Sequence, residues 1–318
     1  MIGTPFRSIV MQVVRWDKAR CGILQMPVEI LTEIAAYLPI PLGDCRWNFT
    51  SLVRLAQVSK LFSEICYKLL YHEVCIRVPN ETGPLTTLVQ QVSRLQIVRT
   101  FYVEVYDIDL VIDRRFQMLT FLKNDRTVQN EDLHPGLRSS LQLTRSALLQ
   151  MTGLTSLHLR IGPNFSEPNY EGVFLPNLKR LFLDLFLTEE VYTFLNRHRK
   201  TIRFLWTSYV EHPSPNQPIG PFPQLSTCYA SIHLLPIILP GSLVNEIGIS
   251  FVDDLYPDMQ LRCMDDLPIT TVSFEVWEGT AGSAIACLSR MTCVEEACIE
   301  LDCESNSIVV VCLWCIKL

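Results

Sequence analysis

The sequence lacks any apolar run long enough to cross a membrane. A spanning helix needs about 20 largely apolar residues, and the most apolar stretch, residues 308–318, is about half that length. A secretory signal is also missing, because the short apolar segment near the N-terminus leads directly into Trp16, Asp17 and Lys18. We therefore expect an intracellular protein, in the cytoplasm or nucleus, with no membrane partner.

Motifs of catalysis and of nucleotide binding are missing as well. The chain contains no G-x-x-x-x-G-K, no G-x-G-x-x-G after a strand, no H-E-x-x-H and no G-x-S-x-G. Its six histidines are scattered without the spacing of metal ligands. We expect no catalytic residue, no metal and no cofactor; an enzyme with a weak motif remains the alternative.

Positive charge is scarce in the last third of the chain. The net charge is −6 overall, but residues 241–318 hold 3 Lys and Arg against 13 Asp and Glu. Such a region repels nucleic acid, and no basic arm stands out elsewhere. We expect no nucleic-acid partner.

Cysteine, by contrast, is plentiful. Six of the twelve cysteines crowd the last 32 residues, and Cys312 and Cys315 form a C-x-x-C pair. A zinc site would need a second pair or nearby histidines, and this region has none. A redox pair would need a helix after its first cysteine, whereas residues 308–316 have the pattern of a strand. The pattern favours packed, reduced thiols over a metal or redox site.

Near the N-terminus, residues 26–71 show the pattern of three short helices. Pro27 suits the first turn of a helix, and the prolines after Leu38 end it. After a polar loop, a second helix begins near residue 51 and a third after Ser59, a suitable N-cap. About nine large apolar side chains lie on these helices. A unit of about 45 residues is too small to bury them all, so part of this surface must contact the rest of the chain or a partner.

The residues of this region resemble an F-box over residues 24–72. The resemblance rests on a set of spaced positions: Met26-Pro27-x-Glu29-Ile30-Leu31, Ile34, Tyr37-Leu38-Pro39, Leu52, Leu55, Val58-Ser59-Lys60, Phe62, Ile65 and Leu70-Tyr71. Met26 stands where leucine is usual, and the loop between Leu38 and Leu52 is longer than common. The resemblance implies docking on the Skp adaptor of a cullin-based ubiquitin ligase. The expected adaptor contacts are Pro27, Ile30, Leu31, Ile34, Leu38, Leu52, Leu55, Val58 and Phe62. The alternative is a helical cap on the following domain.

A repeat follows. The template apolar-x-x-apolar-x-apolar begins at residues 154, 178, 202, 225, 244, 269 and 294, and Thr207 is its one exception among 21 positions. The starts lie 19 to 25 residues apart, within the range of leucine-rich repeats. Residues 73–153 are less regular, with a further strand at 98–103, flanking helices and an insertion at about 106–136. We expect an α/β protein: a possible tail at 1–23, the F-box at 24–72, and an irregular leucine-rich-repeat-like solenoid at 73–318.

An F-box followed by such repeats resembles F-box proteins of fungal type. That combination implies a substrate-recognition subunit of a Skp–cullin–F-box ligase, in which the solenoid binds an unknown substrate protein. The alternative is a repeat-built scaffold with no ligase role. By strand alternation, the residues between the template positions point away from the core. They give these expected substrate-binding residues: His158, Arg160, Phe182, Asp184, Trp206, Tyr229, Glu275 and Glu300. The successive aromatic residues are typical of a binding surface, although the insertion or a C-terminal segment could cover them. The acidic units that follow favour a basic partner.

Overall fold

The computed structural model describes most of the chain from Met26 to Trp314. The described residues are 26–38, 40–43, 46–78, 82–105, 135–161, 170–185, 187–207, 219–250, 262–265, 267–277, 284, 287–289, 291, 293–302 and 308–314. Contacts divide the chain into two compact units, residues 1–70 and 71–318. The expected tail at 1–23 and nearly all of the expected insertion lie outside the described residues.

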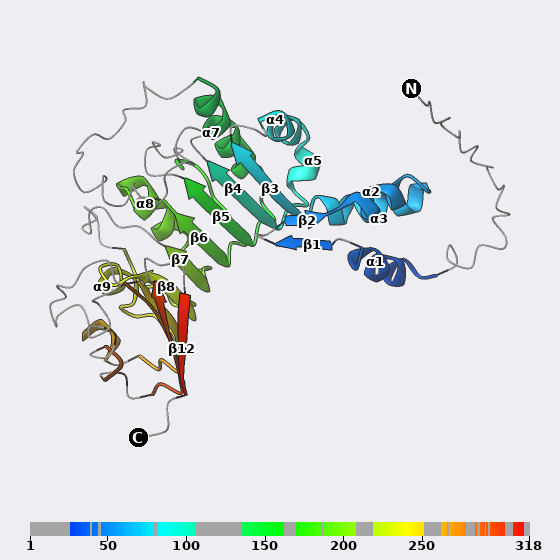
Figure 1. The fold of residues 1–318 in the computed structure, drawn as a ribbon. Helices are drawn as coiled ribbons and strands as arrows, with labels where there is room; N and C mark the ends of the chain where they lie inside the picture. Colours follow the sequence, from blue (N-terminus) through cyan, green and yellow to red (C-terminus); the bar gives the residue numbers. More distant parts are fainter. Residues whose placement is uncertain are drawn as a thin grey trace, which may run out of the picture. The chain divides into compact units, whose positions relative to one another are not determined.

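The first unit contains the three expected helices, α1 (Val28–Ala36), α2 (Thr50–Ala56) and α3 (Lys60–Leu70) (Figure 1). The backbone of Pro27 is extended, so this residue precedes α1, and its carbonyl accepts the first bond of the helix from Leu31 at 3.1 Å. The Ser59 hydroxyl accepts a bond from the Phe62 amide at 3.2 Å, which confirms it as the cap of α3.

The segment between α1 and α2 differs from the polar loop expected there. It forms a small antiparallel hairpin of β1 (Ile40–Gly43) and β2 (Arg46–Asn48), with Ile40 opposite Asn48. Ile40 and Trp47 favour strands. The glycine and the polar residues of this segment gave it the composition of a loop in the sequence.

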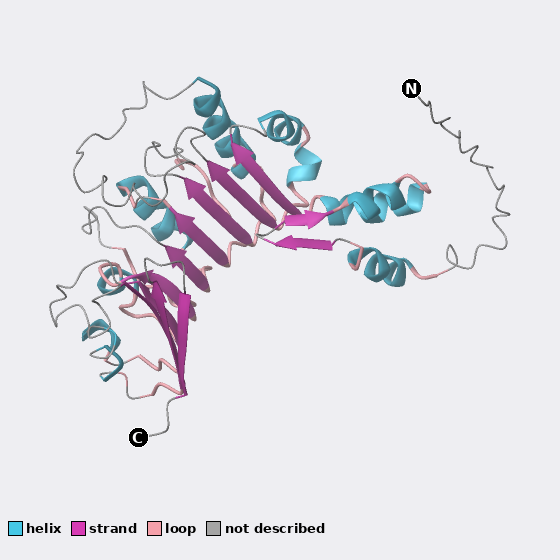
Figure 2. Cartoon of the chain, viewed as in Figure 1, coloured by secondary structure: helices cyan, strands magenta, loops and turns pink. Residues whose placement is uncertain are grey.

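The second unit is built on one large sheet. Nine strands run parallel in chain order, and β12 (Ile308–Trp314) adds to β11 in the antiparallel sense (Figure 2). The parallel strands are β3 (Glu73–Val78), β4 (Thr100–Val105), β5 (Ser156–Ile161), β6 (Arg180–Asp184), β7 (Phe204–Thr207), β8 (Thr227–Ser231), β9 (Glu246–Ser250), β10 (Thr271–Trp277) and β11 (Glu296–Asp302). Every template segment of the sequence contributes one strand. This confirms the expected fold class, an N-terminal helical unit followed by an irregular solenoid-like α/β region.

Each repeat forms the same backbone hydrogen bond to the repeat before it. The amide just before a strand donates to the equivalent carbonyl of the preceding repeat, for example Arg203 to Lys179 at 2.8 Å and Thr270 to Asn245 at 2.8 Å. The first template residue of each unit from 154 to 269 is buried. The repeats therefore stack in register from unit to unit.

Short helices lie in the connections of the described chain and cover one face of the sheet (Figure 2). These helices are α4 (Thr82–Gln90), α5 (Val92–Leu95), α7 (Pro135–Leu148), α8 (Glu189–His198) and α9 (Leu235–Ile238), with a 3-10 turn, η5, at Arg262–Met264. Their buried side chains and the inward side chains of the strands form one hydrophobic cluster. Within the described part of the chain, no helix has the length and apolar character needed to cross a bilayer.

Candidate functional site

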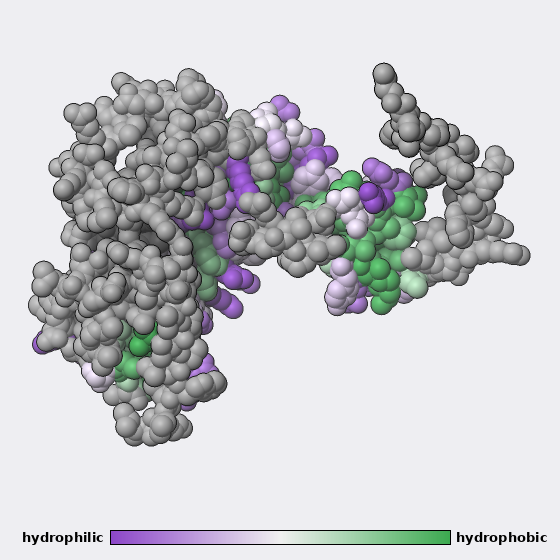
Figure 3. All heavy atoms as spheres, in the orientation of Figure 1, coloured by the Kyte–Doolittle hydropathy of each residue, from purple (hydrophilic) through white to green (hydrophobic). Residues whose placement is uncertain are grey.

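The first unit exposes an unusual amount of apolar surface. Among the described residues eleven large hydrophobic side chains are exposed, and seven of them lie between residues 26 and 58. The seven are Met26, Val28, Ile30, Ile34, Tyr37, Val53 and Val58. Figure 3 shows hydrophobic residues gathered on the surface of these helices. A contiguous exposed apolar patch on a small unit marks an interaction surface.

The nine expected adaptor contacts divide into three groups by burial. Pro27, Ile30, Ile34 and Val58 are exposed, and Leu38 and Leu55 are half-buried. Leu31, Leu52 and Phe62 are buried in the small core that α1, α2 and α3 share. These last three hold the unit together and present little surface in the free chain, and a direct contact between them and the adaptor stays a prediction.

Sequence reasoning missed part of the exposed surface. Tyr37 is 88% exposed and follows Ile30 and Ile34 on the same side of α1, at offsets of seven and three residues. Val53 is also exposed, on α2. Tyr37 appeared in the quoted motif, and its helical offset from Ile30 was the signal that could have placed it in this set.

A second candidate surface lies on the sheet, on the face opposite the hydrophobic core. We call it the outer face; its side chains alternate with buried ones along each strand, as in β4 and β7. Register places five aromatic residues in one row across neighbouring strands. This aromatic row consists of Tyr102, His158, Phe182, Trp206 and Tyr229. The structure thus brings together four of the expected substrate-binding residues and adds Tyr102.

The first three rings of the aromatic row contact one another. The centroids of Tyr102 and His158 lie 3.9 Å apart, and those of His158 and Phe182 lie 3.8 Å apart with nearly parallel planes. Phe204, from the neighbouring row, packs 4.6 Å from Phe182. Phe204 in turn lies 5.8 Å from Tyr229, so ring contacts link Tyr102 to Tyr229 across the outer face.

His158 is held neutral within this stack. Burial and the nearby guanidinium of Arg180 lower the pKa of His158 to about 3. Its Nε2 lies 3.1 Å from the Ser156 hydroxyl. His198 on α8 is also buried; its Nε2 accepts a bond from the Leu175 amide and its Nδ1–H donates to the Phe194 carbonyl. Burial lowers the pKa of His198 too, so both histidines pack as neutral rings.

This arrangement predicts a loss of stability on mild acidification. Both pKa values lie below the ordinary value of about 6.5, so the unfolded chain binds more protons than the folded chain below that pH. The free energy of unfolding should fall as the pH drops from about 7 to about 5. Burial and the nearby Arg99 lower the pKa of His72 as well. Replacing His158 by Phe removes one of these titrating rings and should make the urea midpoint less dependent on pH. An unchanged pH slope in this variant would contradict the assigned environment of His158.

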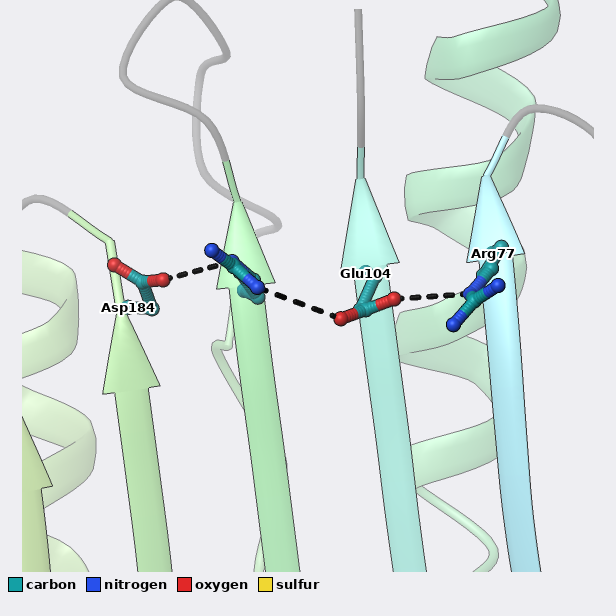
Figure 4. Close-up of polar contacts among 4 residues, drawn as sticks. Arg77, Glu104 and Asp184 are labelled. Atoms are coloured by element: carbon teal, nitrogen blue, oxygen red, sulfur yellow. Dashed lines mark hydrogen bonds and ion pairs between the residues drawn. The ribbon is translucent and has the colours of Figure 1, made fainter. Parts of the chain in front are cut away.

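A row of alternating charges runs beside the aromatic row, toward the carboxyl ends of the strands (Figure 4). The Arg77 Nε lies 3.0 Å from the Glu104 carboxylate, and Arg160 lies between Glu104 at 3.7 Å and Asp184 at 2.9 Å. We call these four residues the charge ladder. Exposed pairs of this kind contribute at most about 1 kcal/mol each, but they neutralise one another. This ladder therefore offers no net charge to a partner.

The aromatic row ends at Tyr229, whose ring packs closely against Gly248 on the next strand. A Cβ at Gly248 would lie 1.9 Å from Cδ1 of Tyr229, so the tyrosine ring occupies the space that any side chain would need. The Tyr229 hydroxyl donates to the Glu246 carboxylate at 2.6 Å, and Thr227 donates to the same group at 3.2 Å. The ring is thus fixed over Gly248 by packing and by a hydrogen bond.

Alanine at Gly248 should therefore destabilise the protein, although alanine is otherwise preferred to glycine in a strand. Forcing the Tyr229 ring aside should lower the free energy of unfolding by about 1–3 kcal/mol, measured by urea denaturation. Gly83 in α4 is the matched control, because no atom lies within 4 Å of a Cβ added there. Gly83→Ala should be neutral or stabilising by up to about 1 kcal/mol. Equal effects of the two substitutions would contradict the close approach.

The remaining expected substrate-binding residues lie on the same row as the charge ladder, farther along the sheet. Glu275 on β10 is exposed and is the register partner of Glu300 on β11, whose side chain lies outside the description. The structure separates this acidic end from Arg160 and Asp184 by several strands.

The structure also bears on the cysteines and on metal binding. Burial raises the pKa of the Cys228 thiol to about 12 and that of Cys263 to about 11, so both stay protonated. Among the described residues, no three His, Cys, Asp or Glu side chains lie close enough together to hold a metal ion. Cys312 lies in β12, as expected of a strand, and Cys315 lies outside the described residues.

Comparison with known families agrees with the architecture of the first unit. Residues 23–77 match the profile of the F-box-like family, and no curated protein matches the chain. The chain thus carries an F-box-like domain at residues 23–77, followed by a region of parallel strands. F-box domains bind the Skp adaptor, and they are typical of non-catalytic ligase subunits.

Proposed function

We propose that this chain is the substrate-recognition subunit of a Skp–cullin–F-box ubiquitin ligase. The observation that carries the proposal is the F-box-like match over three helices whose surface exposes Ile30, Ile34 and Tyr37. Their exposure leaves a small unit less stable unless a partner covers them. Burying one large apolar side chain contributes about 1.5–3 kcal/mol of stabilising free energy. The Skp adaptor is the partner that an F-box implies.

In this proposal the domains divide at about residue 72, and the repeat region at 73–318 binds the substrate protein through its outer face. Support comes from the aromatic row, because Trp and Tyr are the residues most enriched at binding hot spots. The chain itself supplies no chemistry. It accelerates ubiquitin transfer by holding the substrate near a conjugating enzyme, which raises the effective concentration.

The test is assembly with purified adaptor and cullin. The full chain should co-elute with the Skp adaptor in size-exclusion chromatography, and it should retain a cullin only when the adaptor is present. A folded chain that ignores the adaptor would contradict the proposal and favour the repeat-built scaffold. Turnover of any substrate by the isolated chain would contradict the non-catalytic role.

A further inference from the structure

The outer face changes character between β8 and β11. Register places Gly248 and Ser273 beyond Tyr229 in the row that the aromatic residues occupy. Gly248 is buried beneath the Tyr229 ring, and Ser273 is half-buried. We call the surface of small side chains from Ser273 to β11 the low part. The Tyr229 ring, fixed over Gly248, forms the boundary between the aromatic part and the low part.

Carboxylates lie on both sides of the low part. On one side, register aligns Glu246 and Glu296 with Thr271 between them; on the other side Glu275 is exposed. Across the described residues from 219 to 302, Arg262 is the one cationic side chain.

Geometry allows an extended chain to use both features. Strands lie about 4.8 Å apart, so crossing from β7 to β11 covers roughly 19 Å, or about six extended residues. The carboxylates stand two residues along each strand from the central row, about 6.6 Å away. A lysine or arginine side chain can span that distance from a backbone lying over Ser273 and its register partner Cys298.

We propose that the substrate is recognised through a basic, extended segment that crosses the outer face from β7 to β11. An apolar side chain of the segment packs against Trp206 and Tyr229, and its lysine or arginine side chains bind Glu275 and Glu296. The inference rests on the proposed function only in calling the bound protein a substrate. The binding surface itself is formed by the sheet. Charge complementarity selects the occupant, since the same carboxylates repel nucleic acid and acidic segments.

The experiment selects random short peptides, displayed on phage, against the full chain, both alone and mixed with the Skp adaptor. Peptides enriched in Lys and Arg are expected, and a selected peptide should bind the Glu275→Gln/Glu296→Gln variant about 2- to 20-fold more weakly. Its binding should also weaken with added salt. The matched control is Glu189→Gln/Glu190→Gln, which removes two exposed carboxylates from α8, a helix packed on the core face.

Enrichment of neutral or acidic peptides, or of none, would overturn the inference, as would equal binding to the two double variants. Adaptor binding is measured on the same preparations. If the adaptor binds and basic peptides do not, the inference fails while the proposed function stands. If basic peptides bind and the chain is indifferent to the adaptor, the proposed function fails while the peptide surface stands.

Discussion

Replacing Ile34 by aspartate is expected to abolish binding of the Skp adaptor at micromolar concentrations. Ile34 is exposed in the free chain, beside Ile30 and close to Tyr37 on α1. In an apolar contact the new carboxylate would be desolvated without a partner, at a cost of about 2–4 kcal/mol. That cost corresponds to a loss of affinity of about 30- to 1000-fold, which isothermal titration with purified adaptor measures.

The control for this substitution is Leu149→Asp. Leu149 is 45% exposed, close to the 43% of Ile34, and it belongs to the second unit. Leu149→Asp should bind the adaptor as tightly as the wild type. Thermal melting of both variants should stay near that of the wild type, because neither side chain is buried. A folded Ile34→Asp variant with unchanged affinity would contradict the position of the adaptor contact.

The second large effect is expected at Trp206. This residue is half-buried, the fourth of the five residues in the aromatic row, and its register partners are Phe182 and Tyr229. Truncation of a tryptophan hot spot in a binding surface costs about 2 kcal/mol or more. Trp206→Ala should therefore lower the affinity for a peptide selected on the wild-type chain by about 30-fold or more. Fluorescence anisotropy measures this affinity, and adaptor binding should be unchanged.

Phe174 offers a matched aromatic truncation. Its side chain is 59% exposed and stacks on His198, which packs on the core side of the sheet. Phe174→Ala should leave both the peptide and the adaptor bound. If Trp206→Ala unfolds the chain, the tryptophan is part of the core; if it binds the peptide normally, the aromatic row has another role. Either result contradicts the site.

The repeated template predicted the strands well because each unit has the same physical requirement. Its first residue must enter the core, and the next template positions alternate inward along a strand, as Leu181 and Leu183 do. Thr207 breaks the apolar pattern in the sequence but still lies buried in β7, since stacking with its neighbours sets its direction. The direction of β12 could not be predicted, because an apolar strand suits either sense of pairing.

The helical unit shows where a pattern is ambiguous. Ile30 and Leu31 are adjacent and both apolar, as are Ile34 and Ala35, so the sequence cannot say which of each pair faces the core. The structure buries Leu31 and Ala35 and exposes the two isoleucines. The small volume of Ala35 was a hint, since a closely packed helix pair favours small residues at its contact.

The outer face was foreseen only in part. Alternation put His158, Phe182, Trp206 and Tyr229 on one face, and register confirms that they form one row. Tyr102 was missed because a long segment separates it from the next repeat, so its pairing with His158 depends on a connection whose length gives no register. The pairs of the charge ladder likewise arise only once the strands are aligned.

Hydrogen exchange of the full chain, with and without the Skp adaptor, tests the central claim most directly. The adaptor should slow exchange in residues 26–38 and 50–62, where the exposed apolar side chains of the F-box-like domain lie. Strands β5 to β9 should exchange at the same rate in both samples. Protection confined to the sheet, or no protection at a saturating adaptor concentration, would contradict the claim that the F-box-like domain binds the adaptor.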